Sequence, residues 1–169
     1  TSVCYAPEGE PQELKMILDE NLEYYEQYGA NLGIRMKHAF ERAFEMGYKK
    51  VLLVGTDVPQ LTEEILEKGF KGLDENDIVI HPTVDGGYYL IAMKEAHDVV
   101  WNVKKYGTNT VIEDTLTQVK IAGLHIHTGT VCRDMDTKED LYNLYQELHN
   151  SSDAENTKEY LNMHLKNRW

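Results

Sequence analysis

Short apolar runs alternate along this chain with longer stretches in which apolar residues recur at helical spacing. The periodic stretches predict helices at Gln12–Leu18, Met36–Phe44, Thr62–Lys71, Asn109–Ala122, Thr137–His149 and Thr157–Asn167. The runs of strand length are Ser2–Ala6, Val51–Val54, Asp77–His81, Tyr88–Met93 and Leu124–His127. A tyrosine-rich segment, Leu22–Tyr28, fits neither pattern and is left unassigned. Strands and helices in alternation predict an α/β sandwich.

The connections predict how the strands are arranged. Val51–Val54 is apolar throughout, which favours burial on both faces and a parallel or mixed sheet. Only Pro82–Gly87 joins the two strands on either side of it, and this link is too short for a helical crossover. We therefore expect that pair to be antiparallel or offset within a mixed, mainly parallel sheet. The chain suits one domain, residues 1–150, with residues 151–169 as a helical extension packed on it.

Composition narrows the class of function. The 17 Lys and Arg against 29 Asp and Glu give a net charge of −12, which repels phosphate backbones and disfavours nucleic-acid binding. No apolar stretch approaches the roughly 18 residues of a membrane helix, so we expect no membrane association. Cys4 and Cys132 lie far apart, which fits neither a disulfide scaffold nor a zinc ribbon. We expect a soluble protein of the reducing cytoplasm.

The segment Gly55–Pro59 directly follows the Val51–Val54 strand. In open α/β sheets, ligands bind beyond the carboxyl ends of the strands. Asp57 there can face a bound metal or phosphate, and Gly55 lets the backbone approach closely. A helix-entry turn in which Asp57 caps backbone amides explains the same residues, and the local sequence leaves both interpretations open.

A second candidate segment is Asp85–Tyr89, which contains Gly86 and Gly87. Two consecutive glycines before a strand are costly in conformational entropy, and they indicate a positive φ or space for a ligand. For this motif alone, a tight turn is the simpler interpretation.

The third candidate segment is Arg133–Thr137, between a predicted strand and a predicted helix. Asp134 and Asp136 are two residues apart, so on an extended chain their carboxylates point the same way and could share a cation. A surface Arg–Asp pair followed by a helix cap is the alternative.

The order and spacing of the motifs are more specific than any one of them. Between Gly29 and Leu144 the chain resembles a bacterial family of glycosyltransferase-like proteins, the radical-SAM/selenodomain-associated transferases. The matching stretches are Gly29–Met36, Val54–Leu61, Asp85–Ile91 and Arg133–Leu141. The resemblance implies the GT-A fold of nucleotide-diphospho-sugar transferases, an α/β/α sandwich, and a more distant similarity to nucleotidyltransferases.

The resemblance also implies roles for single residues. Asp57 would bind Mg²⁺ or Mn²⁺ beside a nucleotide diphosphate, with Asp134 or Asp136 as a second ligand. Asp85 is a candidate catalytic base by position only. The loop Tyr106–Thr110 takes the place of a mobile Trp-Ser-Thr loop of the family. The expected substrate-binding residues are Gly55, Thr56, Gly86, Gly87, Tyr88 and Thr108.

Two departures from the family pattern bear on function. Val84 stands where the family usually has Glu. The family also begins with a strand and a basic donor-binding loop, expected upstream of Thr1, and nothing in this chain replaces them. Without that strand, two neighbouring strand edges would be unpaired. We then expect either a homodimer formed by strand pairing or exchange, or a rearrangement that fills the gap, together with weak nucleotide binding.

Three functions follow as hypotheses. The first is glycosyl transfer from a nucleotide sugar. The second is nucleotidyl transfer to a phosphorylated small molecule. The third is a catalytically silent binding module that kept the fold.

Overall fold

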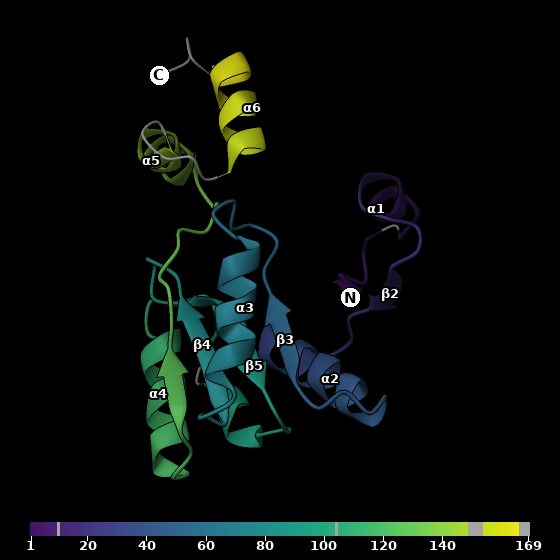
Figure 1. Cartoon of the computed structure of the whole chain (residues 1–169), viewed down its shortest axis with the longest axis vertical. Coiled ribbons are helices and arrows are strands. Elements are labelled where there is room, and N and C mark those ends of the chain that lie inside the picture. Colours follow the sequence, from purple (N-terminus) through teal and green to yellow (C-terminus); the bar gives the residue numbers. More distant parts are fainter. Residues whose placement is uncertain (10, 104, 149–153, 166–169) are drawn as a thin grey trace.

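The computed structural model describes residues 1–9, 11–103, 105–148 and 154–165 (Figure 1). Its main sheet has the strand order β3-β5-β4-β6. β5 is antiparallel to both β3 and β4, and β6 is parallel to β4. These strands are β3 (Val51–Val54), β4 (Ile78–Pro82), β5 (Tyr88–Met93) and β6 (Ile126–Thr128). The predicted α/β fold with a mixed sheet, and the antiparallel β4–β5 pair, are confirmed.

Helices cover both faces of the main sheet. On one face, α2 and α4 enclose a core that contains Phe40, Ile80, Trp101 and Val119. On the other face, α3 packs against Val79 and its neighbours. The helices of the main body are α2 (Leu32–Glu45), α3 (Glu63–Gly72), the 3₁₀ turn η1 (Asp98–Trp101) and α4 (Val111–Ile121). The result is a three-layer sandwich with the sheet in the middle.

A second, two-stranded sheet lies beside the first. β1 (Ser2–Tyr5) and β2 (Glu23–Glu26) pair in parallel, and the short helix α1 (Pro11–Ile17) connects them. β2 occupies the segment that the sequence left unassigned. Its sequence, Glu-Tyr-Tyr-Glu, has no apolar run because the strand is only half-buried in this small sheet.

The burial of β3 differs from the expectation. β4 is buried along its whole length and β5 along nearly all of it, but each of the four β3 residues is only half-buried. The reason is position, since within the described residues β3 pairs along one edge only, with β5. Apolar composition alone does not distinguish such an edge strand from a central one.

Two further helices follow the main sheet. α5 (Lys138–Leu148) begins with a capping box, in which the Asp140 N–H donates to Thr137 Oγ1 at 3.1 Å and the Thr137 N–H donates to Asp140 Oδ2 at 2.9 Å. α6 (Glu155–Leu165) packs on α5 through Leu161. The sequence Asn150-Ser151-Ser152-Asp153 is typical of a linker between two helices, and it lies outside the described residues. No helix in the described part of the chain is long and apolar enough to span a membrane.

Candidate functional site

Three loops that carry the predicted site residues meet at one edge of the main sheet. β3, β4 and β6 run in the same direction, so their carboxyl ends lie together, where β5 begins. The loop at residues 55–61 follows β3, the turn at 83–87 joins β4 to β5, and the segment 129–137 follows β6. This edge is where open α/β sheets bind ligands.

Asp57 lies in the loop after β3, with its carboxylate folded over Gly55. A Cβ at Gly55 would stand 2.7 Å from Asp57 Oδ1, so the glycine makes this close approach possible. Asp57 and Thr56 are exposed. The helix-cap interpretation of Asp57 is not supported, because Thr62 caps α3 by accepting a hydrogen bond from the Ile65 N–H at 3.3 Å.

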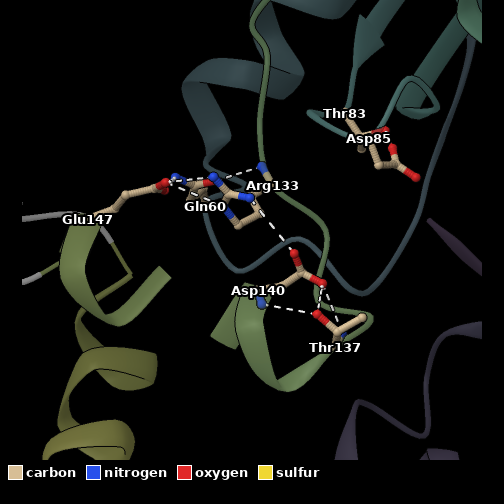
Figure 2. Close-up of polar contacts among 7 residues, drawn as sticks. All are labelled: Gln60, Thr83, Asp85, Arg133, Thr137, Asp140 and Glu147. Atoms are coloured by element: carbon tan, nitrogen blue, oxygen red, sulfur yellow. Dashed lines mark hydrogen bonds and ion pairs between the residues drawn. The ribbon is translucent and has the colours of Figure 1, made fainter. Parts of the chain in front are cut away.

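Asp85 organises the turn between β4 and β5. Its Oδ1 accepts a hydrogen bond from the Thr83 hydroxyl (Figure 2). The same oxygen accepts a second hydrogen bond, of 3.0 Å, from the Gly87 N–H. Gly86 has φ of +94°, so the predicted positive φ is present at the first glycine of the pair, and it is absent from Gly87. Neither of these hydrogen bonds uses the second carboxylate oxygen, Oδ2, and the Asp85 side chain is exposed.

Main-chain pairing brings Asp134 to the same edge as Asp85. Thr83 and Cys132 form a parallel bridge that continues the β4–β6 pairing, and the Val84 N–H donates to the Cys132 carbonyl at 3.1 Å. This arrangement aligns the two loops that follow the parallel strands. It places Asp134 two residues beyond the bridge on one strand and Asp85 two residues beyond it on the other.

The carboxylates of the three loops also affect one another electrostatically. Partial burial raises the pKa of Asp134, and the negative charges of Asp85, Asp136 and Asp57 raise it further. The site therefore gathers carboxylates from all three loops. Even so, among residues 1–9, 11–103, 105–148 and 154–165 no three acidic, His or Cys side chains are grouped closely enough to hold a metal ion by themselves.

Tyr88 lies at this edge but faces the α2 and α4 side of the sheet, where it packs against the core. Burial, and then the nearby Tyr106, raise the pKa of Tyr88 well above its usual value. The two hydroxyl oxygens are buried, and neither has a hydrogen-bond partner of good geometry among the described residues. The Tyr106 ring covers Gly33 at the start of α2, where any side chain would overlap it. Thr108, from the same loop, donates to the Lys105 carbonyl at 3.1 Å.

Sequence reasoning missed two features of this edge. The contact of Tyr106 with Gly33 joins motifs that are far apart in the chain. Gln60, which lies within a recognised motif but was given no role, accepts a hydrogen bond from the Arg133 N–H at 2.9 Å. Arg133 forms ion pairs with Glu147 and Asp140 of α5, which lie outside its own segment. Side-chain contacts over such separations leave no local pattern that could have revealed them.

Comparison with known proteins shows which family the chain belongs to. Residues 1–108 match the profile of a family described as "Uncharacterized protein conserved in bacteria (DUF2064)". The chain belongs to this DUF2064 family. A crystal structure described as a "putative nucleotide-diphospho-sugar transferase" from Desulfovibrio desulfuricans G20 is 32% identical to the chain. The match has a TM-score of 0.86 and covers 96% of this chain and 74% of the other. The comparison with curated proteins finds no match.

Proposed function

We propose that this DUF2064 protein is a metal-dependent transferase that moves a glycosyl group from a nucleotide sugar to an acceptor. The observation that carries the proposal is the position of Asp57, Asp85 and Asp134 on the three loops that meet at the carboxyl-end edge of the sheet. The likeness in fold to a protein described as a nucleotide-diphospho-sugar transferase supports it.

The side chains at this edge suit Mg²⁺ or Mn²⁺ in chemical type. Carboxylate oxygens are hard ligands, and a cation between them would offset the burial and the repulsion that together raise the pKa of Asp134. Magnesium commonly takes one or two protein carboxylates and completes its coordination with water and substrate phosphates. Two carboxylates, Asp57 with Asp134 or Asp136, are thus a sufficient protein share, although no three side chains in the described ranges form a ready cage.

Each residue at the edge then has a distinct task. A bound divalent cation would supply positive charge that stabilises a departing nucleoside diphosphate. Gly55 gives the space in which the Asp57 carboxylate lies against the backbone. In the transfer step the acceptor oxygen bonds to the anomeric carbon, the bond from that carbon to the diphosphate oxygen breaks, and the acceptor gives up its proton. Asp85 Oδ2 is the candidate to receive this proton, because Oδ1 is already held by Thr83 and Gly87.

The test is a thermal-shift screen of nucleotide sugars and nucleoside triphosphates with Mg²⁺ or Mn²⁺, followed by chromatography of the products. We expect a nucleotide sugar to raise the melting temperature only when metal is present, and a nucleoside diphosphate to be released when an acceptor is added. Release of pyrophosphate from a triphosphate would instead establish nucleotidyl transfer. Binding without turnover of any donor would favour a silent binding module.

A further inference from the structure

Arg133 is the centre of a polar network that joins three segments of the chain (Figure 2). Its side chain, 19% exposed, donates to Glu147 Oε1 through Nε at 3.3 Å and through Nη2 at 3.1 Å. Nη1 lies 3.8 Å from Asp140 Oδ1. The Arg133 N–H donates to Gln60 Oε1 at 2.9 Å, and Gln60 Nε2 donates to Glu147 Oε2 at 3.2 Å. Arg133, Gln60 and Glu147 therefore form a closed ring of contacts.

This ring connects the segments that carry the site carboxylates. Gln60 belongs to the loop of Asp57, and Arg133 directly precedes Asp134 in the chain. Within the described residues, the hydrogen bond that joins the loop at 55–61 to the segment at 129–137 is the one between Arg133 and Gln60. The ring is thus placed to set the distance between Asp57 and Asp134.

The positive charge of Arg133 is paired with carboxylates of α5 and not with those of the candidate site. The planar guanidinium group reaches Glu147 and Asp140 on α5, an arrangement that its forked donors favour. Neither Asp57 nor Asp134 forms an ion pair with a residue in the described ranges. The arginine can therefore hold the loops together while both carboxylates stay available to a cation.

We propose that Arg133, together with Gln60 and Glu147, is a positioning residue that holds the Asp57 and Asp134 loops in register so that their carboxylates face one divalent cation. The inference rests on the proposed function, because it assigns these carboxylates to a metal. Partners that orient metal ligands are commonly as necessary for affinity as the ligands themselves. A purely stabilising role would lower the melting temperature and leave cation affinity unchanged.

Three variants and one control separate these roles. Gln60→Ala removes the hydrogen bonds of the Gln60 side chain with Arg133 and Glu147 and leaves the net charge unchanged. Arg133→Met removes the cation and keeps an extended side chain, and Arg133→Lys keeps the charge but cannot form the forked contact. The control, Lys37→Met, breaks the 2.9 Å pair between Lys37 of α2 and the exposed Asp98 of η1.

The readouts are Mn²⁺ affinity by electron paramagnetic resonance, alone and with UDP or GDP, and hydrogen exchange at residues 55–61 and 131–137. We expect Gln60→Ala and Arg133→Met to weaken Mn²⁺ binding about tenfold and to speed exchange in both loops, with Arg133→Lys intermediate and Lys37→Met unchanged. Wild-type affinity in both network variants would overturn this inference alone. Failure of the wild-type protein to bind Mn²⁺ under all these conditions would overturn the proposed function and this inference with it.

Discussion

Gly86 lies so close to Asn109 that a side chain at position 86 would overlap the Asn109 backbone carbonyl group. Its φ of +94° is also one that residues with a Cβ rarely adopt. The Ile112 N–H donates to the Gly86 carbonyl at 3.0 Å, so the first turn of α4 is attached to the same point. Both the positive φ and the lack of space beside Asn109 therefore require glycine at position 86.

We expect Gly86→Ala to lower the free energy of unfolding by at least about 2 kcal/mol, because left-handed strain adds to overlap with backbone that cannot rotate away. Urea denaturation measures the loss. Gly47→Ala is a matched control, since Gly47 has φ of +91° and nothing within 4 Å of the added methyl group. That variant should lose only about 1 kcal/mol. Equal losses in the two variants would show that the Asn109 contact is unimportant.

Asp134→Asn should raise the melting temperature of the metal-free protein at neutral pH. Partial burial, and then the charges of Asp85, Asp136 and Asp57, raise the pKa of Asp134 in the folded state, so its ionised form opposes folding there and a neutral amide removes both penalties. The gain should shrink as the pH falls through the raised pKa, because protonation gives the wild-type protein the same relief. Melting scans in EDTA test this, with the exposed Glu75→Gln as a control for net charge. A lower melting temperature for Asp134→Asn in EDTA would contradict a raised pKa of Asp134 in the folded protein.

His81 should make the fold sensitive to mild acid. Burial, and then the charges of His127 and Lys68, lower the pKa of His81 to about 4. Its Nδ1 lies 3.1 Å from the Tyr89 hydroxyl, which donates to the Thr130 carbonyl at 3.2 Å. The unfolded chain binds a proton near the ordinary His pKa of about 6.5, whereas the folded chain does so only near 4, so stability should fall as the pH drops through this window.

Urea denaturation at a series of pH values measures this dependence. His81→Asn should remove up to about one proton from the slope of stability against pH. His125→Asn, at a side chain that is 80% exposed, is the comparison and should change the slope much less. An unchanged slope in His81→Asn would show that this imidazole titrates alike in both states.

The edges of β1 and β3 predict self-association of the 169-residue chain. Within the described ranges, β1 pairs only with β2 and β3 only with β5, which leaves one edge of each strand open to another strand. Light scattering over a range of protein concentrations should show a dimer. The mass of a single chain at every concentration would contradict pairing between copies.

The sequence predicted the elements whose pattern is local. β4 and β5 follow from their apolar runs, and the antiparallel pairing follows from the short link between them. β2 was missed because its half-buried Tyr24 and Tyr25 lie between two glutamates and resemble a surface helix or loop. A hydrophobic pattern reveals a strand only where the strand is buried, and β2 is at most half-buried.

The candidate site was predictable to a similar degree. Asp57 and Asp134 became candidates because each follows a predicted strand, and parallel strands bring such positions to one edge of the sheet. The Gln60–Glu147 hydrogen bond joins residues 87 positions apart and depends on where the loop after β3 meets α5. Contacts of that kind arise from packing in three dimensions, which hydrophobic periodicity does not encode.

The most direct measurement is a Mn²⁺ titration of the wild-type protein and Asp57→Asn, followed by electron paramagnetic resonance, with UDP, GDP, ADP, CDP and dTDP in turn. We expect at least one nucleotide to raise the Mn²⁺ affinity of the wild type about tenfold or more, because diphosphate oxygens complete the coordination that the carboxylates begin. Asp57→Asn should abolish this gain. No Mn²⁺ binding with any nucleotide, or binding that Asp57→Asn leaves unchanged, would contradict a metal and nucleotide site at this edge of the sheet.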